Sequence, residues 1–413
     1  MWAFLPSTGK EIIQEGYQYL DLTYTSDPGE DLSWWVKATT EHYYYDGDFP
    51  VAYDYDYSVP TWRDAPYTIF KDDWKVYWQS LEFQGNYKGI TSNKLAFGAK
   101  YSLNSADLES YDVDPFFQYE DDELTYYNIS AFVQDEIGLS ANASLILGLN
   151  HNLYDEDVFK GDVERTNPRV GIVVGIGPRT RLKGLYGEAF RVPNLNEFLY
   201  NDGGLTQISN SNLEAEVIRT GEVILEHDLN AKWGLRASAY RTNLESLIQA
   251  EEVVSPIDFA ETVVQFLNSP DDIISTGLEF EIRKYISEDA SGYLSVALQT
   301  TENIETGEKL PNSPEELVNL GVSVPLVRGE VYLSVDNQYV GEVLSKDLSE
   351  TIDSFFLANA TLSHNALTSN LEMSVSVYNL FNVDYSHPGT FDHVQTEIPQ
   401  DERTFGLNVK YRF

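Results

Sequence analysis

The sequence predicts an all-β chain of about 17 antiparallel strands. Apolar and polar residues alternate with a period of two along many segments, the spacing that sends successive side chains of a strand to opposite faces. Apolar residues three and four positions apart, which would indicate helices, do not recur over any long stretch. Short turns and long loops follow one another between the alternating segments. These observations indicate an antiparallel sheet with turns at one end and long loops at the other.

The last segment shows the alternation clearly. Between residues 404 and 413 every second residue is apolar, and the residues between them are polar or glycine. The apolar set is Phe405, Leu407, Val409, Tyr411 and Phe413. The same period recurs at residues 94–103, 278–283, 331–339 and 370–377. Such a strand has one face suited to lipid or to a core and one suited to water.

In chain order, the predicted strands cover residues 17–25, 32–45, 73–87, 93–106, 125–136, 143–152, 168–177, 181–189, 216–227, 232–248, 274–286, 291–301, 315–326, 330–340, 354–364, 370–379 and 403–413. Most are about ten residues long, enough for a tilted strand to cross a bilayer. Turn residues fill the short connections at 26–31, 177–180, 228–231, 287–290 and 326–329. The long connections cover residues 46–72, 107–124, 153–167, 190–215, 249–273, 302–314, 341–353 and 380–402.

This separation of loop lengths is typical of a bacterial outer-membrane barrel, and not of a β-sandwich or a propeller. We therefore expect an antiparallel transmembrane β-barrel whose apolar face contacts lipid. The polar face would then surround a lumen lined by Glu222, Glu279, Glu281, Arg283 and Glu372.

Charge and residue usage exclude several function classes. The net charge of −39 argues against a nucleic-acid partner, because phosphate binding needs a basic surface. The chain has no Cys, so it can form neither disulfides nor thiolate metal sites. It lacks the Gly-x-Ser-x-Gly, phosphate-loop and His-Glu-x-x-His motifs, so we expect no enzyme and no resident cofactor or metal.

The acidic residues gather in the long connections, which hold 40 of the 66 Asp and Glu but only 7 of the 27 Lys and Arg. Two explanations stay open. The charges keep exposed loops soluble, or they form a mouth that attracts cations.

Several motifs together resemble the barrel of a TonB-dependent outer-membrane receptor. They are "NPRVGIVVGI" at 167–176, "LYGEAFRVPNLNEF" at 185–198, "NLEAEVIRTGEV" at 212–223 and "VYNLFNVDY" at 377–385. Residues 129–152 resemble an earlier strand pair of the family, although His151 departs from its usual basic residue, and Ala215 stands where proline is usual. The motifs follow the family order from about residue 125 to the end.

The resemblance implies uptake of a scarce nutrient across the bacterial outer membrane, most often a ferric siderophore, haem or cobalamin. Its partners would be outer-membrane lipid, the barrel-insertion machinery and, for an intact receptor, the TonB energy-coupling complex. The apolar positions from Phe405 to Phe413 resemble the family's recognition signal for insertion into the membrane.

The family barrel has about 22 strands around a plugged lumen. No segment of this chain resembles the plug domain, the energy-coupling box or a signal peptide. If the last strand runs toward the periplasm, an odd strand count implies roughly five further strands before residue 17. We therefore interpret residues 1–413 as one receptor-like barrel domain that lacks the plug and the first strands, and we expect a gap beside residues 17–25.

Candidate ligand-binding residues are weakly marked. Tyr43, Tyr44, Tyr45, Tyr53 and Tyr55 surround the first long loop, where they could bind a flat or catecholate ligand or form an aromatic belt at the membrane interface. Arg191 is followed by Val192-Pro193. This tripeptide either only ends a strand, or Arg191 contacts the ligand.

His387 and His393 lie in the last long loop, as metal-chelate contacts or as solvated residues. Other functions also stay open: a passive porin-like channel, a structural or adhesive β protein, or a non-functional remnant of a split receptor gene.

Overall fold

One antiparallel sheet of 18 strands dominates the computed structural model, which describes residues 3–4, 11–52, 68–155, 158–159, 164–202, 204, 206–256, 262–287, 289–327, 329–368, 370–390, 393 and 395–412. Its 17 long strands are β2 (Ile12–Ser26), β3 (Leu32–Ala52), β4 (Thr68–Tyr87), β5 (Asn93–Val113), β6 (Phe116–Ser140), β7 (Ala143–Tyr154), β8 (Glu164–Gly175), β9 (Thr180–Arg191), β11 (Glu216–Asn230), β12 (Trp233–Glu245), β15 (Ile273–Ser287), β16 (Ala290–Asn303), β17 (Glu316–Val327), β18 (Val331–Val340), β21 (Phe355–Thr368), β22 (Leu371–Tyr378) and β25 (Thr404–Tyr411). Each overlaps one predicted segment, so the predicted number and order of strands are confirmed.

The remaining elements are short. The two-residue strand β1 (Ala3–Phe4) pairs with the end of β3. A three-stranded sheet contains β10 (Gln207–Ile208), β13 (Ile248–Val254) and β14 (Thr262–Asn268). Two small hairpins pair β19 (Val343–Leu344) with β20 (Thr351–Ile352), and β23 (Ser386–Pro388) with β24 (Glu397–Pro399). Helix α1 covers Leu195–Phe198. Within the described ranges, no helix has the length and apolar character needed to span a bilayer.

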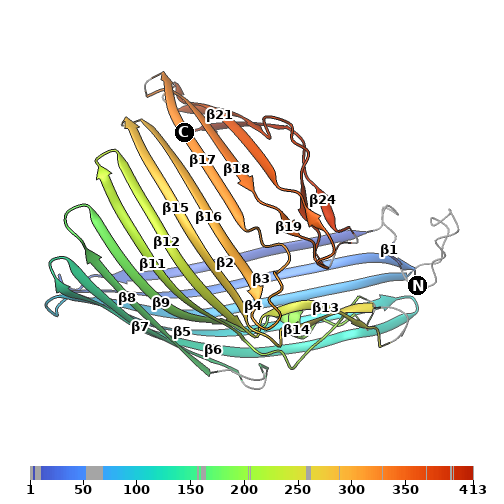
Figure 1. Ribbon diagram of the computed structural model, residues 1–413. Coiled ribbons are helices and arrows are strands. Elements are labelled where there is room, and N and C mark those ends of the chain that lie inside the picture. Colours follow the sequence, from blue (N-terminus) through green and yellow to red (C-terminus); the bar gives the residue numbers. More distant parts are fainter. Residues whose placement is uncertain are drawn as a thin grey trace.

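The large sheet curls into an open trough (Figure 1). Each long strand pairs antiparallel with the next long strand, as β2 does with β3 and β22 does with β25. Among the described strands, no pairing joins β2 to β25, so the two outermost long strands leave the sheet unclosed. The gap expected beside residues 17–25 is therefore present. We call the end with the short connections the turn end and the opposite end the loop end.

The two faces of the sheet divide as the alternation predicted. The outer face carries exposed apolar residues, including Leu278, Phe280, Phe405 and Leu407, of which Phe405 is 73% exposed. The inner face is the one on which α1 and the three-stranded sheet pack. Strand alternation and register place Glu222, Glu279, Glu281, Arg283 and Glu372 on this inner face, opposite the exposed apolar set.

Two rows of aromatic rings cross the outer face of β2–β5. Near the turn end, the Trp34 ring centroid lies 5.6 Å from that of Tyr24 and 6.3 Å from that of Phe83. Toward the loop end, His42 stacks on Tyr77 at 4.3 Å and lies 6.0 Å from Tyr44. From Trp34 to Tyr44, a rise of about 3.3 Å per residue and a tilt of about 40° give a band roughly 25 Å tall. This height matches the apolar band of a membrane barrel.

One predicted long loop, residues 107–124, is wrong in the structure, and a second, residues 249–273, contains regular structure. Residues 107–124 mostly continue strands β5 and β6, which join by a tight turn at Asp114-Pro115. Residues 249–273 contain the hairpin of β13 and β14. Polar side chains occupy both faces of the extensions of β5 and β6, which hides the alternation there. The backbone ladder nevertheless continues, because pairing satisfies its N–H and C=O groups.

Candidate functional site

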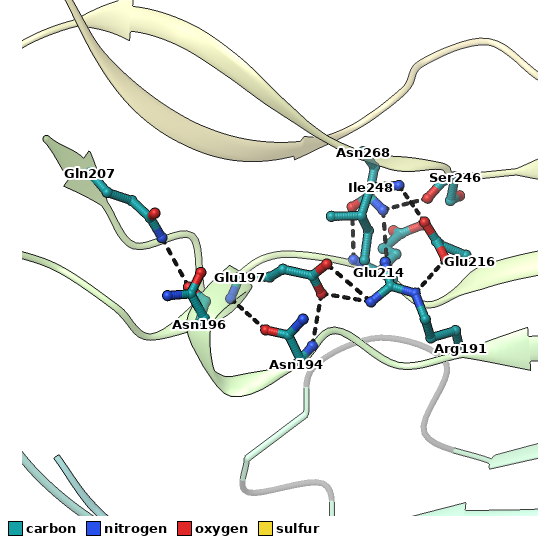
Figure 2. A network of polar contacts seen from close by, with 10 residues as sticks. All are labelled: Arg191, Asn194, Asn196, Glu197, Gln207, Glu214, Glu216, Ser246, Ile248 and Asn268. Carbon is teal, nitrogen blue, oxygen red and sulfur yellow. Dashed lines mark hydrogen bonds and ion pairs between the residues drawn. The ribbon is translucent and has the colours of Figure 1, made fainter. Parts of the chain in front are cut away.

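A polar network at the loop end holds the segment after β9 against the inner face. Arg191 Nε donates to Glu216 Oε2 at 2.6 Å, and Arg191 also donates to Glu197 at 2.8 Å (Figure 2). The side chains of Asn194 and Glu197 form a capping box at the start of α1. The other oxygen of Glu216 accepts the backbone N–H of Ile248 at 2.8 Å. Because both carboxylates are buried and fully paired, this network sets the direction of the chain beyond β9.

The network directs two leucines onto the wall formed by β4, β5 and β6. Leu195 and Leu199 pack against the inner-face cluster of Val76, Ala106 and Leu108. The same two leucines pack against a second cluster that includes Phe159, Phe198, Leu213 and Ile248. Helix α1 and the residues beside it therefore connect the wall to the three-stranded sheet. This segment, residues 192–199, covers part of the inner face, and we call it the roof.

A cavity of about 730 Å³ lies between this roof and the wall. Its volume falls within the range of small-molecule sites in proteins. The aromatic side chains that line it are Tyr17, Tyr43, Trp74, Trp78, Tyr126, Tyr154 and Phe159. Polar groups among them include Glu41, Gln79, Lys100, Asn104 and Asn128. Flat apolar faces with a few polar groups between them suit a ligand with an organic shell.

A row of polar residues crosses the wall on the loop-end side of the cavity. Asp72 on β4, Ser110 on β5 and Glu120 on β6 lie side by side in this row. Asp72 Oδ1 accepts hydrogen bonds from Trp74 Nε1 at 2.7 Å and from Ser110 Oγ at 2.9 Å. Ser110 Oγ also lies 3.5 Å from Glu120 Oε2. The other oxygen of Glu120 is buried, without a hydrogen-bond partner in the part of the chain that the structure describes.

Burial and mutual repulsion set the protonation of this row. Burial raises the pKa of Asp72 to about 6, although its two hydrogen bonds oppose the shift. Burial, assisted by the charges of Asp122 and Asp72, raises the pKa of Glu120 to about 8. Burial and the charges of Asp72 and Asp202 also raise the pKa of Tyr200, whose ring lies 5.8 Å from Trp74. Glu120 therefore carries a proton at neutral pH, whereas Asp72 is largely ionised.

The predicted tyrosines divide between the two faces. Tyr43 and Tyr45 lie on the inner face, where Tyr43 lines the cavity. Tyr44 points to the outer face, beside His42 in the aromatic row. Tyr53 and Tyr55 lie outside the described residues. The two explanations thus concern different tyrosines: Tyr44 has the outward position of a belt residue, and ligand contact by Tyr43 and Tyr45 stays a prediction.

The other predicted ligand residues, Arg191, His387 and His393, do not line the cavity. Arg191 is engaged by Glu197 and Glu216, and its contact with a ligand stays a prediction. His387 stacks on Phe355 at 5.9 Å beside a separate cavity of about 280 Å³. The Nδ1 atom of His393 lies 2.9 Å from Thr390 Oγ1. Over the described ranges, no three or more His, Cys, Asp or Glu residues are arranged to hold a metal ion.

The predicted insertion signal lies on the outer face of β25. Leu407, Val409 and Tyr411 are exposed there with Phe405, and Phe413 lies outside the described residues. The apolar side chains have the outward orientation that the alternation predicted, and their recognition by the insertion machinery stays a prediction.

Sequence reasoning missed most of the cavity. Trp74, Trp78 and Tyr126 are aromatic residues at inner-face positions of strands whose other inner residues include Ser80, Ser102 and Asn128. The signal that could have identified them is an aromatic residue in a sequence position whose neighbours two residues away are mostly polar. The roof residue Leu195 had no such sign, because its contacts depend on how the chain beyond β9 folds back.

Comparisons with known proteins agree with this architecture. A family model described as "TonB dependent receptor-like, beta-barrel" matches residues 6–380. The search of curated proteins finds no significant match.

Among solved structures, the chain is similar to the copper transporter OprC, with 16% identity and a TM-score of 0.74 over 97% of this chain and 66% of that one. It is similar to the ferric yersiniabactin uptake receptor FyuA from Yersinia pestis, with 13% identity and a TM-score of 0.73 over 98% and 62%. The ferric citrate transporter FecA gives 14% identity and a TM-score of 0.73 over 98% and 62%. The chain thus spans slightly less than two thirds of each of these proteins.

Proposed function

Because the chain belongs to the TonB-dependent receptor-like β-barrel family, we propose that it forms part of the wall of an outer-membrane receptor for a metal chelate. The nutrient would be a ferric siderophore or a related complex with an organic shell. The observation that carries this proposal is the aromatic cavity on the inner face at the loop end. A chelate contacts a protein mainly through its organic shell, and aromatic rings offer large rigid contact surfaces at little entropic cost.

The outer face supports placement in a membrane. Exposed apolar residues such as Leu22, Leu81 and Leu103 lie between the two aromatic rows, as lipid contact favours. Outer-membrane lipid and the barrel-insertion machinery are therefore the partners that we propose for this surface. The TonB energy-coupling complex is proposed as a partner of the intact receptor, which would release ligand by an externally driven change in binding.

Quenching of tryptophan fluorescence tests the proposed site directly. Trp74 and Trp78 line the cavity, so a coloured ferric trihydroxamate bound there should quench their emission. We expect the replacements Trp74→Phe and Trp78→Phe to remove most of the saturable quenching. Trp74→Ala should also weaken binding by roughly tenfold, since a lost aromatic contact costs about 1–2 kcal/mol.

Trp233 provides the matched control. It lies at the turn end, where Lys284 Nζ is 4.5 Å from its ring centroid. Trp233→Phe should leave the saturable quenching and the affinity unchanged. Equal quenching in the Trp74→Phe/Trp78→Phe double variant and the parent chain would place the ligand elsewhere and reject the cavity as its site.

A further inference from the structure

Around the cavity the inner face carries the three carboxylates of Glu15, Glu41 and Asp72 and the ammonium group of Lys100. Glu41 lines the cavity and accepts a hydrogen bond from Tyr17, and Glu15 Oε2 lies 3.4 Å from Tyr43 OH. Asp72 lies next to the cavity on its loop-end side, and its carboxylate accepts a hydrogen bond from the cavity residue Trp74. Lys100 is the one basic residue among the described residues that line the cavity. A ligand in this cavity would therefore experience a negative potential.

Basic side chains nearby do not offset this charge. Arg191 is already neutralised by Glu197 and Glu216. Lys71 and Lys75 occupy outer-face positions of β4, and they pair with Asp48 at 2.6 Å and Asp73 at 3.2 Å. The eight long connections, which lie between strands at the loop end, hold 40 acidic residues against 7 Lys and Arg, so this end of the chain has an overall negative charge.

The aromatic rings of the cavity also favour a cationic ligand over an anionic one. The face of an indole or phenol ring attracts cations and repels anions through its quadrupole. Trp74, Trp78 and Tyr43 present such rings beside the carboxylates. Rings and carboxylates thus both disfavour a polyanion, and they favour a ligand that brings either no charge or positive charge.

We infer that the ligand of this receptor is an uncharged or cationic metal chelate, such as a trihydroxamate complex, and not a polyanionic tris-catecholate. This inference rests on the proposed function and adds the charge class of the ligand. The acidic residues of the loop end then act in selectivity, in addition to any effect on solubility.

Three probes that share one chelate but differ in net charge separate the effect of ligand charge from that of ligand shape. One linear ferric trihydroxamate carries a free terminal amine and is cationic. The same chelate acetylated on that amine is neutral, and the succinylated form is anionic. We expect affinity, measured by tryptophan quenching with the full chain in detergent, to fall from cationic to neutral to anionic. Each step should be roughly threefold to tenfold at low salt, and the differences should shrink as the ionic strength rises.

Two double variants test which carboxylates are responsible. Glu41→Gln/Asp72→Asn removes two inner-face charges and should reduce the preference for the cationic probe by roughly threefold to tenfold. The preference is the ratio of the affinities for the cationic and the neutral probe, so a general loss of affinity cancels, and an unchanged far-ultraviolet circular dichroism spectrum shows that the variant is folded. Asp107→Asn/Glu109→Gln removes two charges from the outer face of β5 at the same end, and it should leave the preference intact.

The possible outcomes separate this inference from the proposed function. Equal affinities across the series, or tightest binding of the anionic probe, would overturn the charge preference while leaving the chelate site standing. Absence of saturable quenching by all three probes would overturn the proposed site and the inference with it. A preference that the Asp107→Asn/Glu109→Gln control also abolishes would reject the inner-face carboxylates as its source.

Discussion

Arg191 Nε lies 2.6 Å from Glu216 Oε2, and this ion pair joins the end of β9 to the start of β11 at the loop end of the sheet. The Glu216 side chain is 10% exposed, and its second oxygen holds the backbone of Ile248. The carboxylate of Glu216 thereby connects β9 and β11, two neighbouring strands of the large sheet, with the three-stranded sheet that packs on the inner face. The roof of the cavity depends on this connection.

Glu216→Gln should loosen the roof, because it weakens the pairing of Arg191 and one support of β13. We expect a local loss of about 2 kcal/mol, smaller than for a fully buried pair because the Arg191 side chain is 43% exposed. Hydrogen exchange of residues 192–202 should accelerate accordingly. Glu372→Gln is the control, since Glu372 pairs with the exposed Arg412 and should cost less than 1 kcal/mol. Similar exchange in both variants would contradict this role.

Stability should fall as the pH rises through the range in which Glu120 titrates. Its pKa is raised from about 4.5 to about 8, mainly by burial, so the folded chain holds a proton that the unfolded chain releases. The stabilisation is complete below about pH 4.5 and is lost as the pH rises through about 8. Urea unfolding in lipid vesicles between pH 5 and pH 9 should show a decrease of a few kcal/mol. Glu120→Gln should flatten this dependence, and an unchanged slope in that variant would exclude Glu120 as its cause.

Gly98→Ala should destabilise the wall, whereas Gly187→Ala should be neutral or slightly stabilising. A Cβ on Gly98 would lie 2.6 Å from the backbone oxygen of Phe83 and 2.6 Å from the Phe132 ring, so the β4–β5 ladder would have to shift. A Cβ on Gly187 would meet nothing within 4 Å. We expect a loss of about 1–3 kcal/mol for the first change and a gain of up to about 1 kcal/mol for the second. Paired urea melts check both, and equal midpoints for the two variants would contradict the close approach.

Replacing outer-face residues of β25 should slow insertion into the membrane. Leu407→Asn/Val409→Asn places two amides on a face that is 55–66% exposed at these positions and that we propose to contact lipid. Folding yield into vesicles that contain the insertion machinery should fall severalfold, because unpaired amides are costly in hydrocarbon. Asn408→Ser alters the inner face of the same strand and should insert normally. Comparable losses in both variants would argue against recognition of the outer face.

The alternation of side chains was sufficient to predict the strands. In β25 and β5, for example, one face must meet an apolar environment, so each second residue is apolar and the strand is visible in the sequence. The extensions of β5 and β6 beyond the proposed membrane band were not visible. Asp107 and Glu109 face outward there as Ser110 and Asp112 face inward, and two polar faces leave no period to detect.

The sequence by itself determined the class of protein, the strand order and which residues share a face, because these follow from local alternation and from the lengths of the connections. It also determined the negative charge of the loop end. Only the tertiary structure decided that Tyr43 and Tyr44 serve opposite faces, and that Trp74, Trp78, Tyr126 and Phe159 converge on one cavity beneath Leu195. These residues come from strands and loops far apart in the chain. Their convergence depends on the curl of the sheet and on the inward fold of the segment beyond β9, which no local pattern encodes.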